Sequence, residues 1–281
     1  MRYTNLSFQY RGHNMTFTHL LIVALIQGIT EFLPISSSGH LILLPNLAGM
    51  TDQGQIIDVA AHIGTLFAVV IYFWADVKGA AAGLPRLMTG KADTPGSFLA
   101  LCLILGTIPV VLFGVFLKLT GLDDAMRGIA VIGWTMLGFG LVLYWADKRG
   151  AEIKTDRSWS VKDALIMGVW QAIALIPGTS RSGITITGAR HLGYDRESAA
   201  KLSMLMSIPT IIASGTLLGL EVASTANATA ARDGAIVAVF SFIAALAALT
   251  LMMRLLKSVS FTPYVIYRVI LGVILLGIAY S

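Results

Sequence analysis

The sequence predicts an all-α polytopic membrane protein built as an inverted-topology repeat, with about six spanning helices and two re-entrant helix-loop-helix hairpins meeting near mid-membrane. Three observations predict this fold. Hydrophobic residues make up 56% of the 281-residue chain and charged residues 12%, a composition typical of integral membrane proteins. Six stretches come close to the roughly 20 apolar residues that a spanning helix needs. Two further apolar runs are shorter, and each ends in a loop rich in glycine and hydroxyl groups.

Two repeats fill a single membrane domain, 1–281, after a polar N-terminal extension at 1–17. The first repeat covers 18–146 and the second covers 163–281. Each consists of one re-entrant hairpin followed by three spans. The hairpins are expected at 18–50 and 163–192, and the spans at 56–75, 97–117, 128–146, 200–220, 234–254 and 263–280. We expect the polar connections at 76–96 and 147–162 to be loops.

The two hairpins are predicted from helices that end too early. The run from His19 to Pro34 has 16 residues and reaches about 22 Å, short of a hydrocarbon core of roughly 30 Å. The run from Asp163 to Pro177 is equally short. Each then breaks into Ser- and Gly-rich backbone, which is tolerated at membrane depth only where it is buried in protein or lines a wet cavity.

The two copies must lie in opposite orientations, because one hairpin and three spans make an odd number of crossings. The broken loops then approach the membrane centre from opposite faces. Lys and Arg gather in the connections around 76–96, 147–162, 190–201 and 254–257, which assigns these connections to the cytoplasm. The first hairpin therefore enters from the outer face, the second enters from the cytoplasm, and both termini lie outside.

Composition excludes several other classes of protein. The single cysteine, Cys102, lies in an apolar span, so there is no disulfide framework and no metal–thiolate site. The formal net charge is +5, but the basic residues sit in short loops where the positive-inside effect explains them. We therefore expect a bilayer environment and no nucleic acid. The sequence leaves the oligomeric state open and allows a homodimer.

The first loop carries groups suited to binding a cation. Gln27 and Glu31 are four residues apart and share one helix face, so an amide oxygen and a carboxylate can coordinate together. The alternative is that Glu31 makes a structural polar contact. A carboxylate in a membrane helix costs about 2.5 to 3.5 kcal/mol even on the lenient insertion scale, and such residues are usually functional. Hard oxygen ligands with few carboxylates suit Mg²⁺ or Ca²⁺, with substrate phosphate oxygens completing the shell.

Two histidines follow this loop, one directly after it and one in the first span. His40 follows the hydroxyls of Ser36, Ser37 and Ser38 and titrates near neutral pH in general, so we interpret it as a general acid/base rather than a structural histidine. Asp58 and His62 are four apart in the first span; they are expected to support the site from behind, or simply to hydrogen-bond each other. Arg268 is the charged residue within the last span.

The second loop, Pro177 to Gly183, is the most specific run in the chain. Its small residues permit tight turns whose N–H groups can cradle phosphate oxygens. Arg181 adds a planar, always-charged fork for bidentate contact. The run is not a nucleotide-binding P-loop, because the Gly-Lys-Ser/Thr ending is absent. With Ser36 and Ser38 of the first loop, the candidate phosphate-binding residues are Gly178, Thr179, Ser180, Ser182 and Gly183.

At these residues the sequence resembles the undecaprenyl pyrophosphate phosphatases of bacterial inner membranes, also called bacitracin-resistance proteins. Their first motif, a Glu or Gln ahead of a second Glu and then Pro-x-Ser-Ser-x-Gly-His, is matched from Gln27 to His40. Their second motif, Pro-Gly-x-Ser-Arg-Ser-Gly, is matched from Pro177 to Gly183. Both motifs are long and occur in order, and the likeness covers nearly the whole chain.

The resemblance implies metal-dependent hydrolysis of a C55 polyprenyl pyrophosphate to the monophosphate carrier of cell-wall synthesis, in the inner membrane with the site toward the periplasm. The family's catalytic residues map onto Glu31, Ser37, His40 and Arg181. Gln27 stands where many relatives have Glu, which leaves one fewer carboxylate for a metal. Either Ser37 attacks the terminal phosphorus with His40 as base, or water positioned by Glu31 or His40 attacks directly.

A second function class fits the same pattern. Inverted repeats with broken helices meeting at mid-membrane are also the design of secondary transporters, and on that interpretation the loops would carry a polyprenyl phosphate head group across the bilayer. A binding protein needs neither His40 nor a nucleophilic Ser37 beside a metal-binding carboxylate. A structural scaffold would leave Glu31 and Arg181 without a purpose. The sequence therefore favours the phosphatase.

Overall fold

The computed structural model describes residues 15–48, 53–122, 126, 128–222 and 227–281. Most of the predicted extension at 1–17 and the last two residues of the first hairpin lie outside these residues. The described part is helical, with the following elements: α1 (Phe17–Thr30), α2 (Ser37–Ala48), α3 (Gln55–Tyr72), α4 (Trp74–Met88), α5 (Pro95–Thr120), α7 (Ile129–Arg149), the short 3₁₀ helix η1 (Asp156–Ser158), α8 (Val161–Ile173), α9 (Arg181–His191), α10 (Arg196–Val222), α11 (Ala228–Leu255) and α12 (Thr262–Tyr280).

The predicted fold class is confirmed. Six helices are long and apolar enough to cross a membrane, namely α3, α5, α7, α10, α11 and α12, and each coincides with a predicted span. The chain is thus a multi-pass, all-α membrane protein. Many large apolar side chains remain exposed along these helices, such as Leu112, Val239 and Ile270, as expected for surfaces that face lipid.

One predicted connection is wrong. Residues 76–96 were expected to form a loop, but α4 occupies most of them and follows α3 after a single non-helical residue, Phe73. Glycines allow α4 to approach α5 closely, since a Cβ at Gly83 would lie 2.3 Å from the Ser97 nitrogen and one at Gly96 would lie 2.1 Å from the Gly79 oxygen. Composition hid this helix, because α4 is less apolar than a span yet rich in alanine, the strongest helix former.

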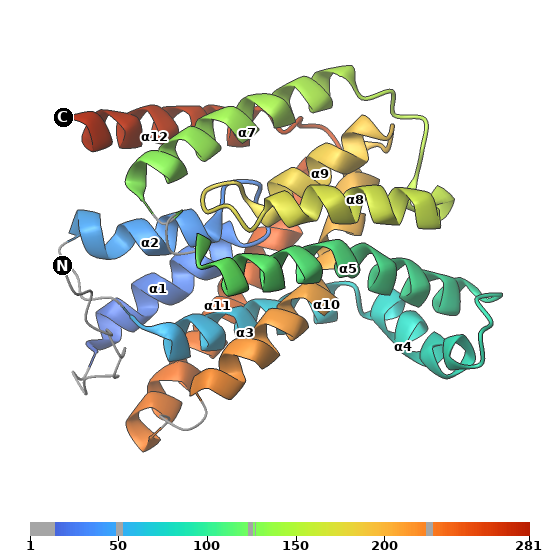
Figure 1. Cartoon of the computed structure of the whole chain (residues 1–281), viewed down its shortest axis with the longest axis horizontal. Coiled ribbons are helices and arrows are strands. Elements are labelled where there is room, and N and C mark those ends of the chain that lie inside the picture. The colour runs from blue at the N-terminus through green and yellow to red at the C-terminus, as the bar shows by residue number, and fades with distance from the viewer. Residues whose placement is uncertain (1–14, 49–52, 123–125, 127, 223–226) are drawn as a thin grey trace.

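Both predicted hairpins are present as two short helices joined by a non-helical loop. In the first hairpin α1 and α2 flank residues 31–36, and in the second α8 and α9 flank residues 174–180. Figure 1 shows the hairpins entering from opposite ends of the bundle, with both loops near its centre. The start of α1 and the end of α12 lie at the same end, as the predicted topology requires.

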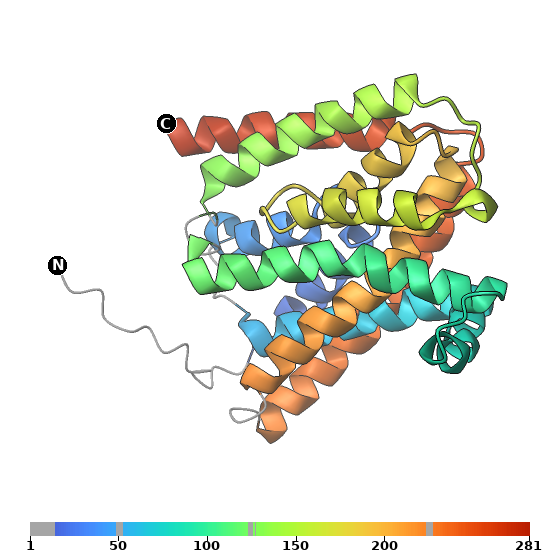
Figure 2. The ribbon, with the colours of Figure 1, turned by 45° about the vertical axis from the view of Figure 1, so that its right-hand side comes forward.

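Helix packing repeats between the two halves. In the first half α1 packs against α11, and α3 packs against α11; in the second half α8 packs against α5, and α10 packs against α5. Two further contacts pair equivalent helices of the two halves, α7 with α12 and α3 with α10. Figures 1 and 2 both show α7 and α12 side by side along one edge of the molecule. This exchange of partners is the pattern that two inverted copies produce around a pseudo-two-fold axis.

The second hairpin is anchored where it starts. The Asp163 carboxylate near the start of α8 accepts hydrogen bonds from the Tyr194 hydroxyl at 2.6 Å and from Lys154 Nζ at 2.9 Å. Burial raises the pKa of the Tyr194 phenol, and the neighbouring carboxylate raises it further. The phenol therefore stays protonated and donates, which ties the loop after α9 to the start of α8.

The orientation can be tested with two exposed alanines at opposite ends of the bundle. In a Cys102→Ala background, an Ala228→Cys variant at the start of α11 should react with a membrane-impermeant thiol reagent in intact cells, and Ala151→Cys should not. Both should react once the cells are permeabilised. The reverse pattern in intact cells would invert the assigned topology.

Candidate functional site

The two loops end in the same local structure. Ser36 and Ser180 both have φ of 72°, a left-handed conformation that is uncommon for a residue other than glycine. Each immediately precedes a helix and accepts a hydrogen bond from the amide three residues later, Gly39 N at 3.3 Å and Gly183 N at 3.1 Å. The sequence repeat thus folds as a structural repeat. It places Ser37 and Arg181 at equivalent positions, the first residue of α2 and of α9.

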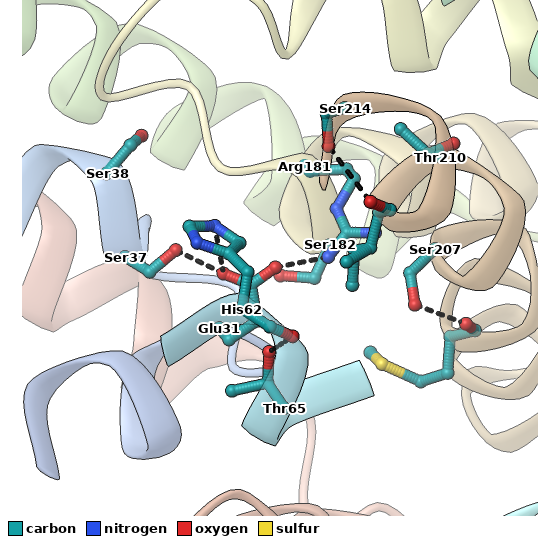
Figure 3. A network of polar contacts seen from close by, with 12 residues as sticks. Glu31, Ser37, Ser38, His62, Thr65, Arg181, Ser182, Ser207, Thr210 and Ser214 are labelled. Carbon is teal, nitrogen blue, oxygen red and sulfur yellow. Dashed lines mark hydrogen bonds and ion pairs between the residues drawn. The ribbon is translucent and has the colours of Figure 1, made fainter. Parts of the chain in front are cut away.

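Glu31 is the centre of the site (Figure 3). Its Oε2 accepts hydrogen bonds from the Ser37 hydroxyl and from Gln27 Nε2, the latter at 3.0 Å. Its Oε1 accepts a hydrogen bond and forms an ion pair with Arg181 Nη2. The Glu31 side chain is only 6% exposed and that of Arg181 16%. A single buried carboxylate is therefore shared between the first residues of α2 and α9.

Further contacts hold the two loops together. Ser182 Oγ donates to the Leu33 carbonyl at 2.9 Å, which joins the second loop motif to the first. A Cβ added at Gly39 would lie 3.5 Å from the Gly178 Cα, so the backbones approach closely at these glycines. Thr135 of α7 donates its hydroxyl hydrogen to the Pro177 carbonyl at 2.6 Å. The loops are thus fixed by each other and by α7.

The second loop retains unused polar groups beside Glu31. Arg181 Nη1 and Thr179 Oγ1 are buried and have no hydrogen-bond partner among the described residues. The hydroxyl oxygens of Ser180 and Ser182 lie 3.1 Å apart. A buried donor without a partner is costly, so these groups are suited to a ligand that carries acceptor oxygens. Ser38 is exposed and lies farther from Glu31 than Ser37 does (Figure 3).

The two histidines lie differently with respect to Glu31. His40 Nδ1 is 2.6 Å from the Ser36 carbonyl and its Nε2 is 2.6 Å from the Tyr267 hydroxyl of α12, so both ring nitrogens are engaged away from Glu31. His62 instead places Nε2 3.9 Å from Glu31 Oε2. Its Nδ1 donates to the backbone carbonyl of Asp58 at 2.8 Å, so Nε2 is the ring nitrogen that faces the site.

The expected side-chain contact between Asp58 and His62 takes a different form. His62 bonds the Asp58 backbone, while the Asp58 carboxylate accepts a hydrogen bond from Gln53 Nε2 at 2.9 Å. A helical i−4 carbonyl is within reach of the imidazole, whereas the carboxylate points back toward the start of α3. His62 therefore lines the site itself, and Asp58 orients it through the main chain.

Few groups at the site could hold a metal. Within the described residues, no group of three or more His, Cys, Asp and Glu side chains could bind one. Gln27 directs Nε2 toward Glu31, but its Oε1 is buried without a hydrogen-bond partner in the described part of the chain. Glu31 and this orphaned oxygen give two hard ligands, which fit Mg²⁺ or Ca²⁺ only if the ligand's phosphate oxygens complete the shell.

Sequence reasoning missed the part that α12 plays. Tyr267 bonds and stacks on His40, with ring centroids 5.7 Å apart. The neighbouring Arg268 hydrogen-bonds to the carbonyls of Pro34 and Gly178, one in each loop. The signal for Arg268 was its charge inside an apolar span, but no local pattern linked it to loops far away in the sequence.

Comparison with known proteins gives the family. Residues 20–274 match the family described as bacitracin resistance protein BacA. The chain belongs to this family. It is 71% identical over 267 residues to a protein of Jannaschia sp. strain CCS1, 70% to one of Dinoroseobacter shibae and 69% to one of Ruegeria pomeroyi, in each case over 95% of this chain and all of the relative. All three relatives are named undecaprenyl-diphosphatase.

The loop contact predicts a strict need for glycine at position 178. Gly178 has φ of 84°, and a Cβ there would lie 2.3 Å from Thr135 Oγ1. Gly178→Ala should lower the free energy of unfolding in detergent by about 1–3 kcal/mol from the backbone conformation alone, with the clash adding to it. Gly215→Ala is the matched control, because nothing lies within 4 Å of its Cβ and alanine favours a helix. Equal stability of the two variants would contradict the tight contact between the loop and α7.

Proposed function

We propose that this BacA-family chain hydrolyses undecaprenyl diphosphate to undecaprenyl phosphate and inorganic phosphate, which regenerates the lipid carrier of peptidoglycan synthesis and confers resistance to bacitracin. The relatives' name supports the reaction, since identity of about 70% extends over their full length. The observation that carries the proposal is the Glu31 carboxylate, shared by a serine hydroxyl and an arginine guanidinium inside the membrane.

The proposed chemistry starts at Ser37, whose hydroxyl donates to Glu31. An activated hydroxyl nucleophile is typically accompanied by a base and by a third group that orients the base. Here Glu31 is the base and Arg181 is the third group. In the first step the Ser37 Oγ–P bond forms, the P–O bond to undecaprenyl phosphate breaks, and the hydroxyl proton passes to Glu31. In the second step water attacks the phosphorus, the Ser37 Oγ–P bond breaks, inorganic phosphate leaves, and Glu31 returns the proton to Ser37. Direct attack by water held at Glu31 is the alternative, with Ser37 only binding phosphate.

The remaining groups are assigned to charge and binding. Phosphoryl transfer needs mainly neutralisation of charge and in-line placement of the nucleophile. The unpartnered Arg181 Nη1 and Thr179 hydroxyl and the amides at the start of α9 would contact the phosphate oxygens. His62, near Glu31, is available for proton transfer, and His40 stays a predicted acid/base that acts from α2.

A divalent cation is part of the proposal. Glu31 and Gln27 Oε1 would hold Mg²⁺ or Ca²⁺ together with the diphosphate. The ion would supply charge neutralisation for the phosphate oxygens. Because Gln27 is neutral, the protein contributes a single carboxylate, and we propose that the metal binds chiefly with the substrate.

The lipid tail has an apolar surface beside the site. A groove of about 570 Å³ lies between α1, α11 and the start of α12, and Leu33 lines it. The Leu33 carbonyl receives the Ser182 hydroxyl, so the groove adjoins the second loop motif. We assign part of the isoprenoid chain to this groove, with the rest in the surrounding lipid. All groups of the site come from one chain, so a homodimer would not be required to build it.

The proposed place of action is the bacterial inner membrane, with the site toward the periplasm. The first hairpin supplies Glu31 and Ser37 and enters from the end that carries few Lys and Arg residues among those described, which the positive-inside effect assigns to the outside. A secondary transporter of the same lipid is the alternative function. It would have no use for a hydroxyl activated by a buried carboxylate, so the Ser37–Glu31 contact favours hydrolysis.

The decisive experiment measures phosphate release by purified protein in detergent. Wild-type protein should release inorganic phosphate from undecaprenyl diphosphate with Mg²⁺ or Ca²⁺ and lose this activity with a chelator. Glu31→Gln keeps the size of the side chain but removes the charge and the base, so turnover per folded protein should fall by at least about 10²-fold. Asp93→Asn is the matched control, because Asp93 is an exposed carboxylate that forms an ion pair with Arg86.

Three outcomes would count against the proposal in different ways. Absence of phosphate release by the wild-type protein would remove the proposed function. Activity that is insensitive to chelator would remove the metal while leaving the hydrolysis. A Glu31→Gln variant with near wild-type turnover would show that the carboxylate shared between the loops is structural.

A further inference from the structure

Arg268 of α12 is a fully buried cation that binds backbone instead of a carboxylate. Its Nε donates to the Met136 carbonyl at 3.2 Å, Nη1 donates to Pro34 at 3.3 Å, and Nη2 donates to Thr135 and Gly178, both at 3.2 Å. The side chain has no accessible surface. No ion pair of Arg268 occurs within the described residues.

The four carbonyls belong to three separate parts of the chain. Pro34 lies in the first broken loop and Gly178 in the second, while Thr135 and Met136 lie in α7. Where a helix breaks, carbonyls lose the amide partners of a continuous helix, and in a membrane interior no water replaces them. The planar guanidinium supplies N–H groups in several directions at once, so one side chain serves both breaks.

The surrounding glycines fit this side chain. A Cβ at Gly183, in the second loop motif, would lie 2.9 Å from Arg268 Nη1, and one at Gly140 of α7 would lie 3.2 Å from the Arg268 Cβ. A side chain at position 183 would therefore crowd the Arg268 guanidinium. The guanidinium therefore lies next to the first turn of α9, the helix that begins with Arg181.

A second buried arginine shows what is unusual about Arg268. Arg190 is also almost fully buried, but it forms ion pairs with Asp147 and Glu152, the ordinary way to compensate a buried charge. Arg268 keeps its charge uncompensated among the described residues. A positive charge next to a loop that has unpartnered hydrogen-bond donors favours the binding of an anion by that loop.

We propose that Arg268 is a positioning residue that locks the two broken loops in one relative position against α7, and so keeps Glu31 and Ser37 in register with Arg181. Its charge also biases the site toward anions. The locking role follows from the contacts alone, whereas its effect on turnover rests on the proposed hydrolysis. Lysine keeps the charge but has no planar fork, so it separates the two roles.

Hydrogen–deuterium exchange of the full chain in detergent tests the lock without relying on activity. In Arg268→Lys and Arg268→Met, amides in peptides covering 31–40 and 176–183 should both exchange faster by at least about tenfold, the effect of losing one hydrogen bond to a charged group. Arg190→Lys is the matched control. It perturbs an equally buried arginine near the other end of α9 and should leave the first loop protected.

Turnover adds a second readout on the same variants. Relative to folded protein, Arg268→Met should lower kcat by about 10²-fold or more. Arg268→Lys should recover substrate affinity, seen as a KM near that of the wild type, while kcat stays low, because charge is restored and alignment is not. If the wild-type protein releases no phosphate, the proposed function fails, and the exchange data still decide the lock.

A variant that keeps Arg268 checks that faster exchange is not simply the result of misfolding after a buried arginine is replaced. Gly140→Ala should favour α7 by helix propensity, yet it crowds Arg268 and should expose both loops to exchange. Unchanged exchange in the two loops of the Arg268 and Gly140 variants would overturn the proposal. So would faster exchange spread evenly to α4 and α5, since Arg268 would then be an ordinary core contact. Wild-type kcat and exchange in Arg268→Lys would reduce its role to charge and overturn the lock.

Discussion

The hydrogen bonds and ion pair of the Glu31 carboxylate connect the two halves of this protein at their centre. Arg181 from the second loop and Ser37 from the start of α2 contact different oxygens of the same group. In a low-dielectric interior an unpaired carboxylate or guanidinium is strongly unfavourable. The two broken helices therefore have to meet, and the proposed nucleophile is placed as a consequence of the same pairing. Stability and chemistry depend here on one contact.

The inverted repeat explains how two unlike functional groups reach one carboxylate. Ser36 and Ser180 share the same backbone conformation and the same capping role, so the residue after each begins a helix near the centre of the bundle. Divergence at this one equivalent position gives a hydroxyl in one copy and a guanidinium in the other. Buried glycines at 39 and 178 let the copies touch. The repeated fold therefore places the two positions at the carboxylate, and the different side chains at those positions give the site its two functional groups.

Much of this arrangement could be predicted from the sequence, because membrane spans and broken helices leave strong local signals. Run length and hydropathy located the six spans, and the two motifs located both loops and Glu31. Helix α4 was not predicted, because its composition lies between that of a spanning helix and that of a loop. The orientation of His40 toward Tyr267, the approach of His62 to Glu31 and the bridging by Arg268 depend on packing between segments distant in sequence. No spacing rule encodes such contacts.

A double-mutant cycle between Glu31 and Arg181, followed by thermal or denaturant unfolding in detergent, tests the central contact most directly. Removing one partner of a buried pair costs about 3–5 kcal/mol because the other charge is left unpaired, whereas replacing both is close to neutral. Glu31→Gln and Arg181→Met should each destabilise the protein strongly, and the double variant should be more stable than either single variant. Additive losses in the double variant would show that the two side chains do not depend on each other, and would contradict this account.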